Sequence, residues 1–254
     1  MNESLVEFSL HDGVAEVTLN RPQRHNALVP ALLQALSEVM IRVEQRAPRA
    51  MVLSARGPSF STGGDVAAFH DTPRDQRAAY AEEVVGGLNG VILQLLRLPV
   101  PTVAAVHGMV TGGSLGLVLA CDLVVADPRA AFTPWYTVVG FSPDGGWTAL
   151  LPERIGRGRA LDLQLRNATL EAGEAHASGL VQCLAEEGQT RERALALAAE
   201  MHTRWSGSVR GTLALTRPDS GTVAAGLEAE KKAFVAQIVS DETEAGMAAF
   251  LSRA

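Results

Sequence analysis

The chain has few cysteines, few aromatic residues and almost no lysine. Only two of its 254 residues are cysteines, Cys121 and Cys183, and both stand in apolar stretches, so we expect two buried free thiols. The 6 histidines are scattered along the chain, and histidine and cysteine do not recur at the spacing of metal ligands. The composition therefore predicts neither a metal centre nor a disulfide framework.

Positive charge and long apolar runs are also scarce. The formal net charge is -6, which argues against a nucleic-acid-binding protein, because such proteins usually carry a basic stripe. The longest apolar run, GLVLACDLVVA, is interrupted by Asp122 and is too short to span a bilayer. The opening MNESLVEFSLHDG lacks the basic and apolar regions of a secretory signal. We therefore expect a cytoplasmic protein without nucleic-acid or membrane partners.

What the chain does have is a recurring order of strand, loop and helix. Residues 14–20 alternate between apolar and polar, as a half-buried strand does, and the apolar residues of 30–46 fall on one helical face. Segments 49–57 and 101–108 are typical of short buried strands, and 77–98 predicts a helix weakened by three glycines. This layout favours an α/β fold of repeated ββα or βα units, with its chemistry on the loops after strands.

The pattern changes toward the C-terminus. Residues 122–132 predict a strand, a turn and the start of another strand. After about residue 190, segments such as RERALALAAEMHTRW and TVAAGLEAEKKAFVAQIVS are helical and carry no strand signal. We therefore divide the chain into a core, 1–190, and a C-terminal helical region, 191–254.

Two glycine pairs each follow an apolar strand, in FSTGGDV (60–66) and VTGGSLG (110–116). Glycine tolerates positive φ and lets a ligand approach the backbone closely. A loop that leads into a helix turns free N–H groups outward, with the helix dipole behind them. Two such loops can aim two N–H groups at one oxygen, as an oxyanion hole does. Each loop taken alone is more typical of an ordinary turn between strand and helix.

In this order and spacing the motifs resemble those of the crotonase superfamily, the enoyl-CoA hydratase/isomerase group. DGVAEVTLNRPQRHNAL is similar to the opening strand and NRP…NAL segment of the family, and FSTGGDV is similar to its FSAGADL loop. PTVAAVHGMVTGGSLGLVLACDLVVA and EAGMAAFLSR are similar to its central and C-terminal segments. The resemblance implies a spiral of repeated ββα units with a C-terminal helical region that packs trimers, as a homotrimer or a dimer of trimers.

The resemblance also implies an acyl-CoA thioester ligand, with no cofactor other than the coenzyme A of the substrate. The thioester oxygen would lie between the N–H groups of Gly64 and Gly113, which would stabilise an enolate. Arg24 would contact a CoA phosphate, with an ordinary surface arginine as the alternative, and Asp65 is also placed to cap its loop. The nucleotide part of CoA would run past six residues: Arg24, Asn26, Ala27, Thr62, Asp65 and Val66.

The chain departs from the hydratase pattern at both catalytic positions. Hydratases of the family use two glutamates to handle a water, and the matching positions here are Gly116 and Tyr136. Adding water across a double bond needs one group to accept a proton and another to deliver one to carbon. We therefore do not expect ordinary hydratase activity, and Tyr136 becomes a candidate contact to the acyl group.

One carboxylate remains near the expected site. GFSPDGGWTALLPERIG (140–156) resembles a segment of the branch that includes the ring-1,2-epoxyphenylacetyl-CoA isomerases, in which the aspartate is the acid/base residue. The resemblance therefore implies that Asp144 moves a proton during isomerisation, although an aspartate in such a sequence can also form a turn. Its apolar neighbours would raise its pKa toward neutral pH. Among them, we expect Trp147 to pack in the core.

Other functions would use the same residues. The 4-chlorobenzoyl-CoA dehalogenase, a crotonase relative, uses an aspartate at this place as a nucleophile. It also needs a histidine base, and the corresponding stretch VVGGLNGVILQLL has Asn89 but no histidine. A hydrolase or decarboxylase of CoA thioesters could use the same oxyanion hole, and an inactive acyl-CoA-binding protein would account for the two missing glutamates. We prefer an isomerase of fatty or aromatic acyl-CoA thioesters.

Overall fold

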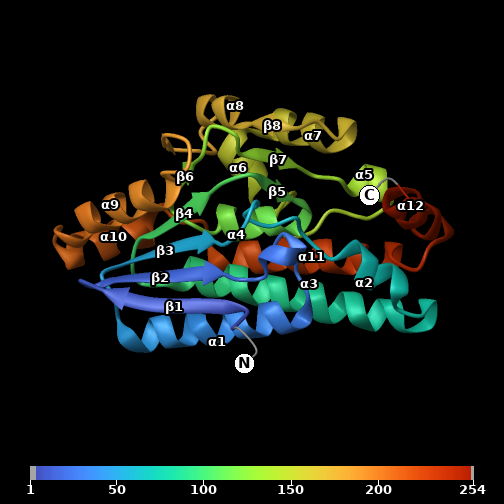
Figure 1. Ribbon diagram of the computed structural model, residues 1–254, viewed down its shortest axis with the longest axis horizontal. Coiled ribbons are helices and arrows are strands. Elements are labelled where there is room, and N and C mark those ends of the chain that lie inside the picture. The colour runs from blue at the N-terminus through green and yellow to red at the C-terminus, as the bar shows by residue number, and fades with distance from the viewer. Residues whose placement is uncertain (1–3, 253–254) are drawn as a thin grey trace.

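The computed structural model describes residues 4–252, which form a mixed α/β fold wound around two sheets (Figure 1). The larger sheet has the order β1-β2-β3-β4-β6-β9, and the smaller has the order β5-β7-β8. The strands of the larger sheet are β1 (Val6–His11), β2 (Val14–Leu19), β3 (Ala50–Ala55), β4 (Thr102–Val106), β6 (Leu123–Ala126) and β9 (Cys183–Leu184). Those of the smaller sheet are β5 (Met109–Thr111), β7 (Ala131–Thr133) and β8 (Leu170–Glu171).

Strand–strand–helix units repeat along the chain, as the resemblance implies. In two successive units the first strand joins the larger sheet and the second joins the smaller: β4 pairs with β6, and β5 pairs with β7, both in parallel. Each unit therefore adds one strand to each sheet and advances the spiral. The helices of the core are α1 (Pro30–Arg46), α2 (Val66–Asp71), α3 (Arg74–Arg97), α4 (Leu115–Leu119), α5 (Tyr136–Val139), α6 (Leu151–Ile155), α7 (Arg157–Arg166) and α8 (Ala172–Ala177).

The strand expected to be half-buried is buried on both faces. All six residues of β2 are buried, so this expectation was wrong. The cause is tertiary: α1 covers one face of the larger sheet and α9 (Thr190–His202) covers the other. The polar residues of β2 find partners inside. The Thr18 hydroxyl lies 2.9 Å from that of Ser54, and Glu16 accepts a hydrogen bond of 2.6 Å from Arg191 of α9.

The remaining expected elements lie close to their predicted bounds. The first predicted helix is α1, and the second, α3, begins three residues before position 77, at Arg74. Cys121 is buried as expected, whereas Cys183 is only partly buried because it stands on β9, the edge strand of its sheet. In the part of the chain that the structure describes, no helix is long and apolar enough to cross a membrane.

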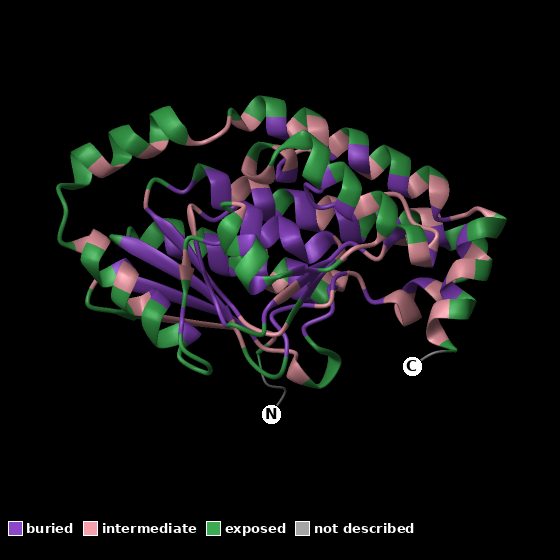
Figure 2. Cartoon of the chain, turned by 90° about the horizontal axis from the view of Figure 1, so that it is seen from above, coloured by how far each residue is buried: buried purple, intermediate pink, exposed green. Residues whose placement is uncertain are grey.

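The C-terminal segment is helical from Thr190 onward. Helix α11 (Ser220–Gln237) lies along α3, and α12 (Asp241–Leu251) lies against α2 and α5. All residues of α10 (Ser206–Thr216) are partly or fully exposed, and Figure 2 shows this exposure along the outer helices. Trp205 and Leu215 are each 88% exposed. The division at residue 190 and the packing of this region in trimers stay predictions.

Candidate active site

The two glycine loops lie against each other. A backbone bridge joins Ser61 to Val110, and the Ser114 hydroxyl donates a hydrogen bond of 2.9 Å to the carbonyl of Ser61. Gly63 has a φ of 74°, and a Cβ atom built on it would lie 2.5 Å from the carbonyl oxygen of Thr111. Only glycine permits this approach of two backbones. The fold therefore brings the ends of β3 and β5 to one place.

The meeting point forms a wall of a cavity of about 340 Å³, which Gly64 and Gly113 both line. Gly113 is the second residue of the 3-10 turn η2 (Gly112–Ser114), where a backbone N–H has no partner within its own turn. On either side of Gly64, the Gly63 carbonyl and the Asp65 N–H both bond to Leu28. Because successive groups in extended backbone point to opposite sides, the N–H of Gly64 points away from Leu28.

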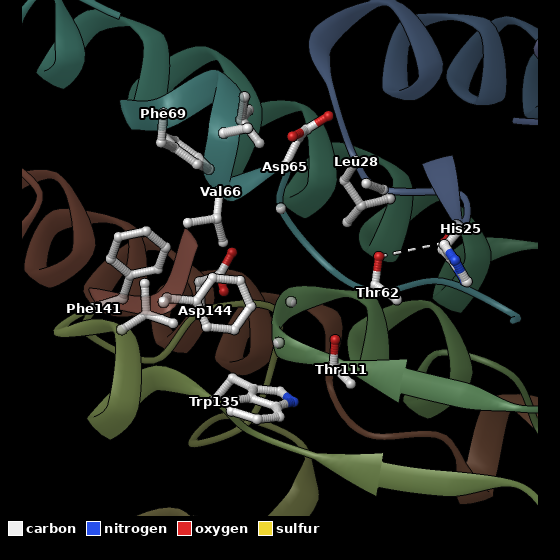
Figure 3. A pocket seen from close by; sticks show the side chains of 18 of the residues that line it. His25, Leu28, Thr62, Asp65, Val66, Phe69, Thr111, Trp135, Phe141 and Asp144 are labelled. Carbon is white, nitrogen blue, oxygen red and sulfur yellow. Dashed lines mark hydrogen bonds between the residues drawn. The ribbon is translucent and has the colours of Figure 1, made fainter. Parts of the chain in front are cut away.

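Asp144 lies within this cavity, with Phe69 and Phe141 on one side and Thr62 and Thr111 on the other (Figure 3). Its carboxylate faces the second glycine loop, since a Cβ atom built on Gly113 would lie 2.7 Å from Oδ2.

The surroundings of Asp144 raise its pKa. The pKa is about 7, and burial is the largest cause of the increase. The hydrogen bond from Tyr136 opposes this shift, and the negative charge of Glu230 adds to it. The Tyr136 hydroxyl donates to Oδ1 at 2.6 Å and also lies 3.0 Å from the carbonyl oxygen of Asp144. A carboxyl group with a pKa near neutrality can both accept and return a proton at physiological pH.

Glu230 of α11 holds the turn that follows Asp144. Its carboxylate accepts hydrogen bonds from the backbone N–H groups of Gly146 (2.7 Å), Thr148 (2.7 Å) and Ala149 (2.9 Å), and from the Thr148 hydroxyl (2.6 Å). Glu230 stands 84 residues from Gly146, and the sequence around it gives no sign of this role. A C-terminal helix therefore positions the candidate proton carrier.

Neither hydratase position offers a carboxylate. A Cβ atom built on Gly116 would collide with the carbonyl oxygen of Gly145 and would lie 2.5 Å from Cδ1 of Ile92, so no side chain fits there. Tyr136 occupies the other position, where it is buried and bonded to Asp144. Among the described residues that line the cavity, Asp65 and Asp144 are the only carboxylates. Asp65 is held by arginines, so Asp144 alone is available for chemistry.

Aromatic and aliphatic side chains surround Asp144. The rings of Phe141 and Phe234 have centroids 5.1 Å apart, and those of Trp135 and Phe250 lie 5.6 Å apart. Phe234 and Phe250 belong to α11 and α12, so the sequence around the glycine loops could not reveal them. The apolar residues that line the cavity near these rings are Phe69, Val84, Leu88, Trp135, Val139, Phe141, Phe234 and Phe250.

The residues expected along the CoA nucleotide do not all lie together: Thr62 lies beside His25, whereas Val66 lies between Phe69 and Asp144 (Figure 3). Arg24 is 51% exposed and pairs with Asp65 at 3.0 Å, and Arg21, which the sequence did not single out, pairs with Asp65 at 3.2 Å. Burial alone would raise the pKa of Asp65, but its hydrogen bonds and charge interactions with these arginines outweigh burial and lower the pKa. Asp65 also caps α2 by accepting a hydrogen bond from the N–H of Ala68. Of the six predicted residues, five line the cavity: Arg24, Ala27, Thr62, Asp65 and Val66.

Asn26 is the sixth, and it lies outside the cavity lining. Its side chain is buried and donates to the carbonyl oxygens of Arg56 (2.8 Å) and Ser59 (2.9 Å). Its Oδ1 accepts from the N–H of Arg21 at 2.8 Å. These bonds use both amide hydrogens and the amide oxygen, and they hold the loop before α1. The structure therefore gives the Asn26 side chain a role in the scaffold and does not place it among the residues that line the cavity.

Comparisons with known proteins agree with this architecture. The chain matches the enoyl-CoA hydratase/isomerase family over residues 9–254. It is 34% identical over 191 residues to 4-chlorobenzoyl coenzyme A dehalogenase-2 of Arthrobacter sp, covering 75% of this chain and 69% of the relative. It is 30% identical over 243 residues to a probable enoyl-CoA hydratase of Rhizobium meliloti (strain 1021), covering 94% and 92%.

A solved structure shares the fold over nearly all of the chain. The crystal structure of enoyl-CoA hydratase from Bacillus halodurans matches with a TM-score of 0.90 at 26% identity, covering 97% of this chain and 100% of that one. Sequence and fold thus point to the same group of CoA-thioester enzymes. The chain belongs to the enoyl-CoA hydratase/isomerase family of the crotonase superfamily.

Proposed function

We propose that the protein is an acyl-CoA isomerase that shifts a double bond, or rearranges a ring, through an enolate. The observation that carries this proposal is a single available carboxylate, Asp144, which faces the Gly113 loop in a buried cavity. An isomerase takes a proton from one carbon and returns it to another. One base can do both if the enolate is stabilised in the meantime. Hydration would need a second acid/base group, for which Gly116 leaves no room.

Each part of the cavity has a role in this proposal. The N–H groups of Gly64 and Gly113 donate to the thioester oxygen, where negative charge develops as the proton leaves. Asp144 removes the proton as a carboxylate and delivers it as a carboxylic acid. Its pKa of about 7 makes both forms available near neutral pH. Tyr136 keeps the carboxylate turned toward the substrate through its hydrogen bond to Oδ1.

The lining of the cavity indicates the class of substrate. The aromatic rings near Asp144 favour a large apolar or aromatic acyl group, because they offer it no charged partner. Arg24, at the other end, is suited to a CoA phosphate. We propose no cofactor other than the coenzyme A that is part of the substrate.

The exposed apolar side chains Trp205 and Leu215 support assembly as a homotrimer or a dimer of trimers. We propose that this assembly works in the cytoplasm.

A second candidate function is the hydrolytic removal of halide from an aromatic acyl-CoA. It is favoured by the similarity to the Arthrobacter dehalogenase and by the aromatic lining. Asp144 would then attack carbon as a nucleophile, and a nearby base would have to activate water. Asn89 donates to the carbonyl of Leu227 and has no basic group. His25 lines the cavity at the end away from Asp144, beside Ser59 (Figure 3). The isomerase therefore remains our first choice.

Proton exchange in heavy water tests the proposal. We expect the wild type to exchange the protons next to the thioester of a butenoyl- or phenylacetyl-type CoA, and Asp144→Asn to bind the same ligand without exchange. Asp75→Asn, at an exposed position, is the matched control and should exchange normally. Binding without exchange by the wild type would instead support an acyl-CoA-binding protein. Chloride release from 4-chlorobenzoyl-CoA would support the dehalogenase, and CoA or carbon dioxide release would support a hydrolase or decarboxylase.

A further inference from the structure

The indole of Trp147 stands behind the second glycine loop. It is 1% exposed and belongs to the main core. Its Nε1–H donates a hydrogen bond of 2.7 Å to the carbonyl oxygen of Gly112. That carbonyl belongs to the same peptide unit as the N–H of Gly113. Gly113 is one of the residues that line the cavity. The ring of Trp147 packs in the core, as expected from the sequence. Core packing alone does not explain the hydrogen bond that its indole N–H donates.

The geometry of the peptide unit links Trp147 to the cavity. In a planar trans peptide, the C=O and N–H bonds point in opposite directions. Because the indole holds the Gly112 oxygen on the buried side, the N–H of Gly113 is aimed to the other side. Gly112 has a φ of 52°, in the region that favours glycine, and glycine leaves the orientation of the following peptide unit free. Two hydrogen bonds to the Gly112 oxygen select one orientation: one from the indole and one from the backbone N–H of Leu115.

We propose that Trp147 is a positioning residue for the oxyanion hole. Its N–H fixes and polarises the Gly112–Gly113 peptide, so that the N–H of Gly113 is ready to donate to a thioester oxygen. Hydrogen bonds in a chain strengthen one another by roughly 10–30% per bond. A chain from the indole through the peptide to the thioester oxygen would use this effect where charge develops. This inference rests on the proposed function, because it assumes that a thioester oxygen binds at Gly113.

Trp147 also connects the oxyanion donor to the proton carrier. Its ring meets that of Tyr136 edge-on, with centroids 6.1 Å apart, and Tyr136 bonds to Asp144. The turn that carries Trp147 is held by Glu230 through the neighbouring residues Gly146 and Thr148. The N–H of Gly113 and the carboxylate of Asp144 must act together on one substrate. Trp147 contacts the supports of both: the Gly112 carbonyl and the ring of Tyr136.

The test removes only the indole N–H. Replacing Trp147 with 3-benzothienylalanine keeps the size and shape of the ring but puts sulfur in place of the N–H, and Trp147→Phe is the simpler variant. We expect kcat to fall about tenfold, because the Gly112 carbonyl keeps only its bond from the N–H of Leu115 and the peptide is held less firmly. KM and the pH at half-maximal kcat/KM should stay unchanged, because the CoA contacts and the partners of Asp144 remain.

A spectroscopic measurement separates positioning from mere packing. A conjugated dienoyl-CoA absorbs at longer wavelength when its thioester carbonyl is polarised, so its red shift on binding reports the oxyanion hole. In the Asp144→Asn background, where turnover is blocked, we expect a red shift that loses at least half its size when the indole N–H is removed. Trp205→Phe, at an exposed position, is the control and should leave the shift intact.

The outcomes distinguish the inference from the function on which it rests. If the benzothienylalanine protein keeps both the full red shift and the wild-type kcat, the role of Trp147 is overturned and the proposed isomerase stands. If the ligand binds to the Asp144→Asn protein without any red shift, the proposed oxyanion hole is overturned together with this inference. Trp147→Phe can fail to fold, and the isosteric variant then decides alone.

Discussion

The hydroxyl of Tyr136 donates a hydrogen bond of 2.6 Å to Oδ1 of Asp144, and both side chains are buried beside the Gly113 loop. Tyr136 stands at one of the two positions where the family resemblance places a hydratase glutamate. Here that position holds a group that orients the one available carboxylate. The hydrogen bond favours the charged form of Asp144, whereas burial and Glu230 favour the neutral form, and the balance leaves the pKa at about 7.

Tyr136→Phe should move the pH dependence of activity upward. The variant removes the hydrogen bond that lowers the pKa of Asp144, so this pKa should rise by about one unit. Since the base must be ionised, kcat/KM measured between pH 5 and 9 should reach half-maximum at a higher pH than in the wild type. Tyr80→Phe, which changes the only other tyrosine, is the control. An unchanged midpoint in Tyr136→Phe would mean that Asp144 is not the titrating base.

Asp144→Asn should make stability less dependent on pH. The pKa of Asp144 is raised from its ordinary 3.8 to about 7 in the folded protein, so between these values the folded state holds a proton that the unfolded state has lost. The free energy of unfolding therefore falls as pH rises from 4 to 7, by up to about 4 kcal/mol. Urea unfolding should show that the stability of Asp144→Asn relative to the wild type is greater at pH 8 than at pH 5, by about 2–3 kcal/mol. A uniform effect at both values would contradict the raised pKa.

Glu230→Gln should destabilise the protein and shift the activity profile in the opposite direction to Tyr136→Phe. The glutamine amide would present N–H groups to the N–H donors of the turn, and we expect a loss of about 2–3 kcal/mol in the free energy of unfolding. Removing the negative charge should also lower the pKa of Asp144 and move the midpoint of kcat/KM to lower pH. Glu228→Gln, a half-exposed site on the same helix, should change neither quantity by much. A midpoint that stays in place would show that Glu230 acts through its hydrogen bonds to the turn and not through its charge.

Gly116→Ala should disrupt the site, although alanine is the better helix former. Its Cβ atom would collide with the Gly145 carbonyl, next to Asp144, so the turn would have to move. We expect a loss of about 1–3 kcal/mol in stability and a fall in kcat. Gly90→Ala in α3, where the added carbon meets open space, is the matched control and should be stabilised by about 0.5–1 kcal/mol. If Gly116→Ala is as stable and active as the wild type, the packing that excludes a second carboxylate is looser than the structure shows.

Local pattern in the sequence predicts much of the fold but not the burial of every element. The amphipathic stretch 30–46 and the short apolar run 101–108 are a helix and a strand in the structure. The alternation in 14–20 predicted a strand correctly but its exposed face wrongly. Alternation records only the polarity of side chains. Whether a second layer such as α9 covers the polar face, and supplies Arg191 to Glu16, depends on residues 175 positions away.

The sequence by itself determined the family, the two glycine loops and the absence of both hydratase glutamates, because these depend on residue identity and short spacing. It singled out Asp144, but the environment of Asp144 comes from the tertiary structure. Glu230 and Phe234 of α11 and Phe250 of α12 reach the cavity from the far end of the chain, and Trp147 reaches Gly112 across a loop. A pKa, the direction of a peptide N–H and the shape of a cavity arise from groups close in space, and folding alone brings such groups together.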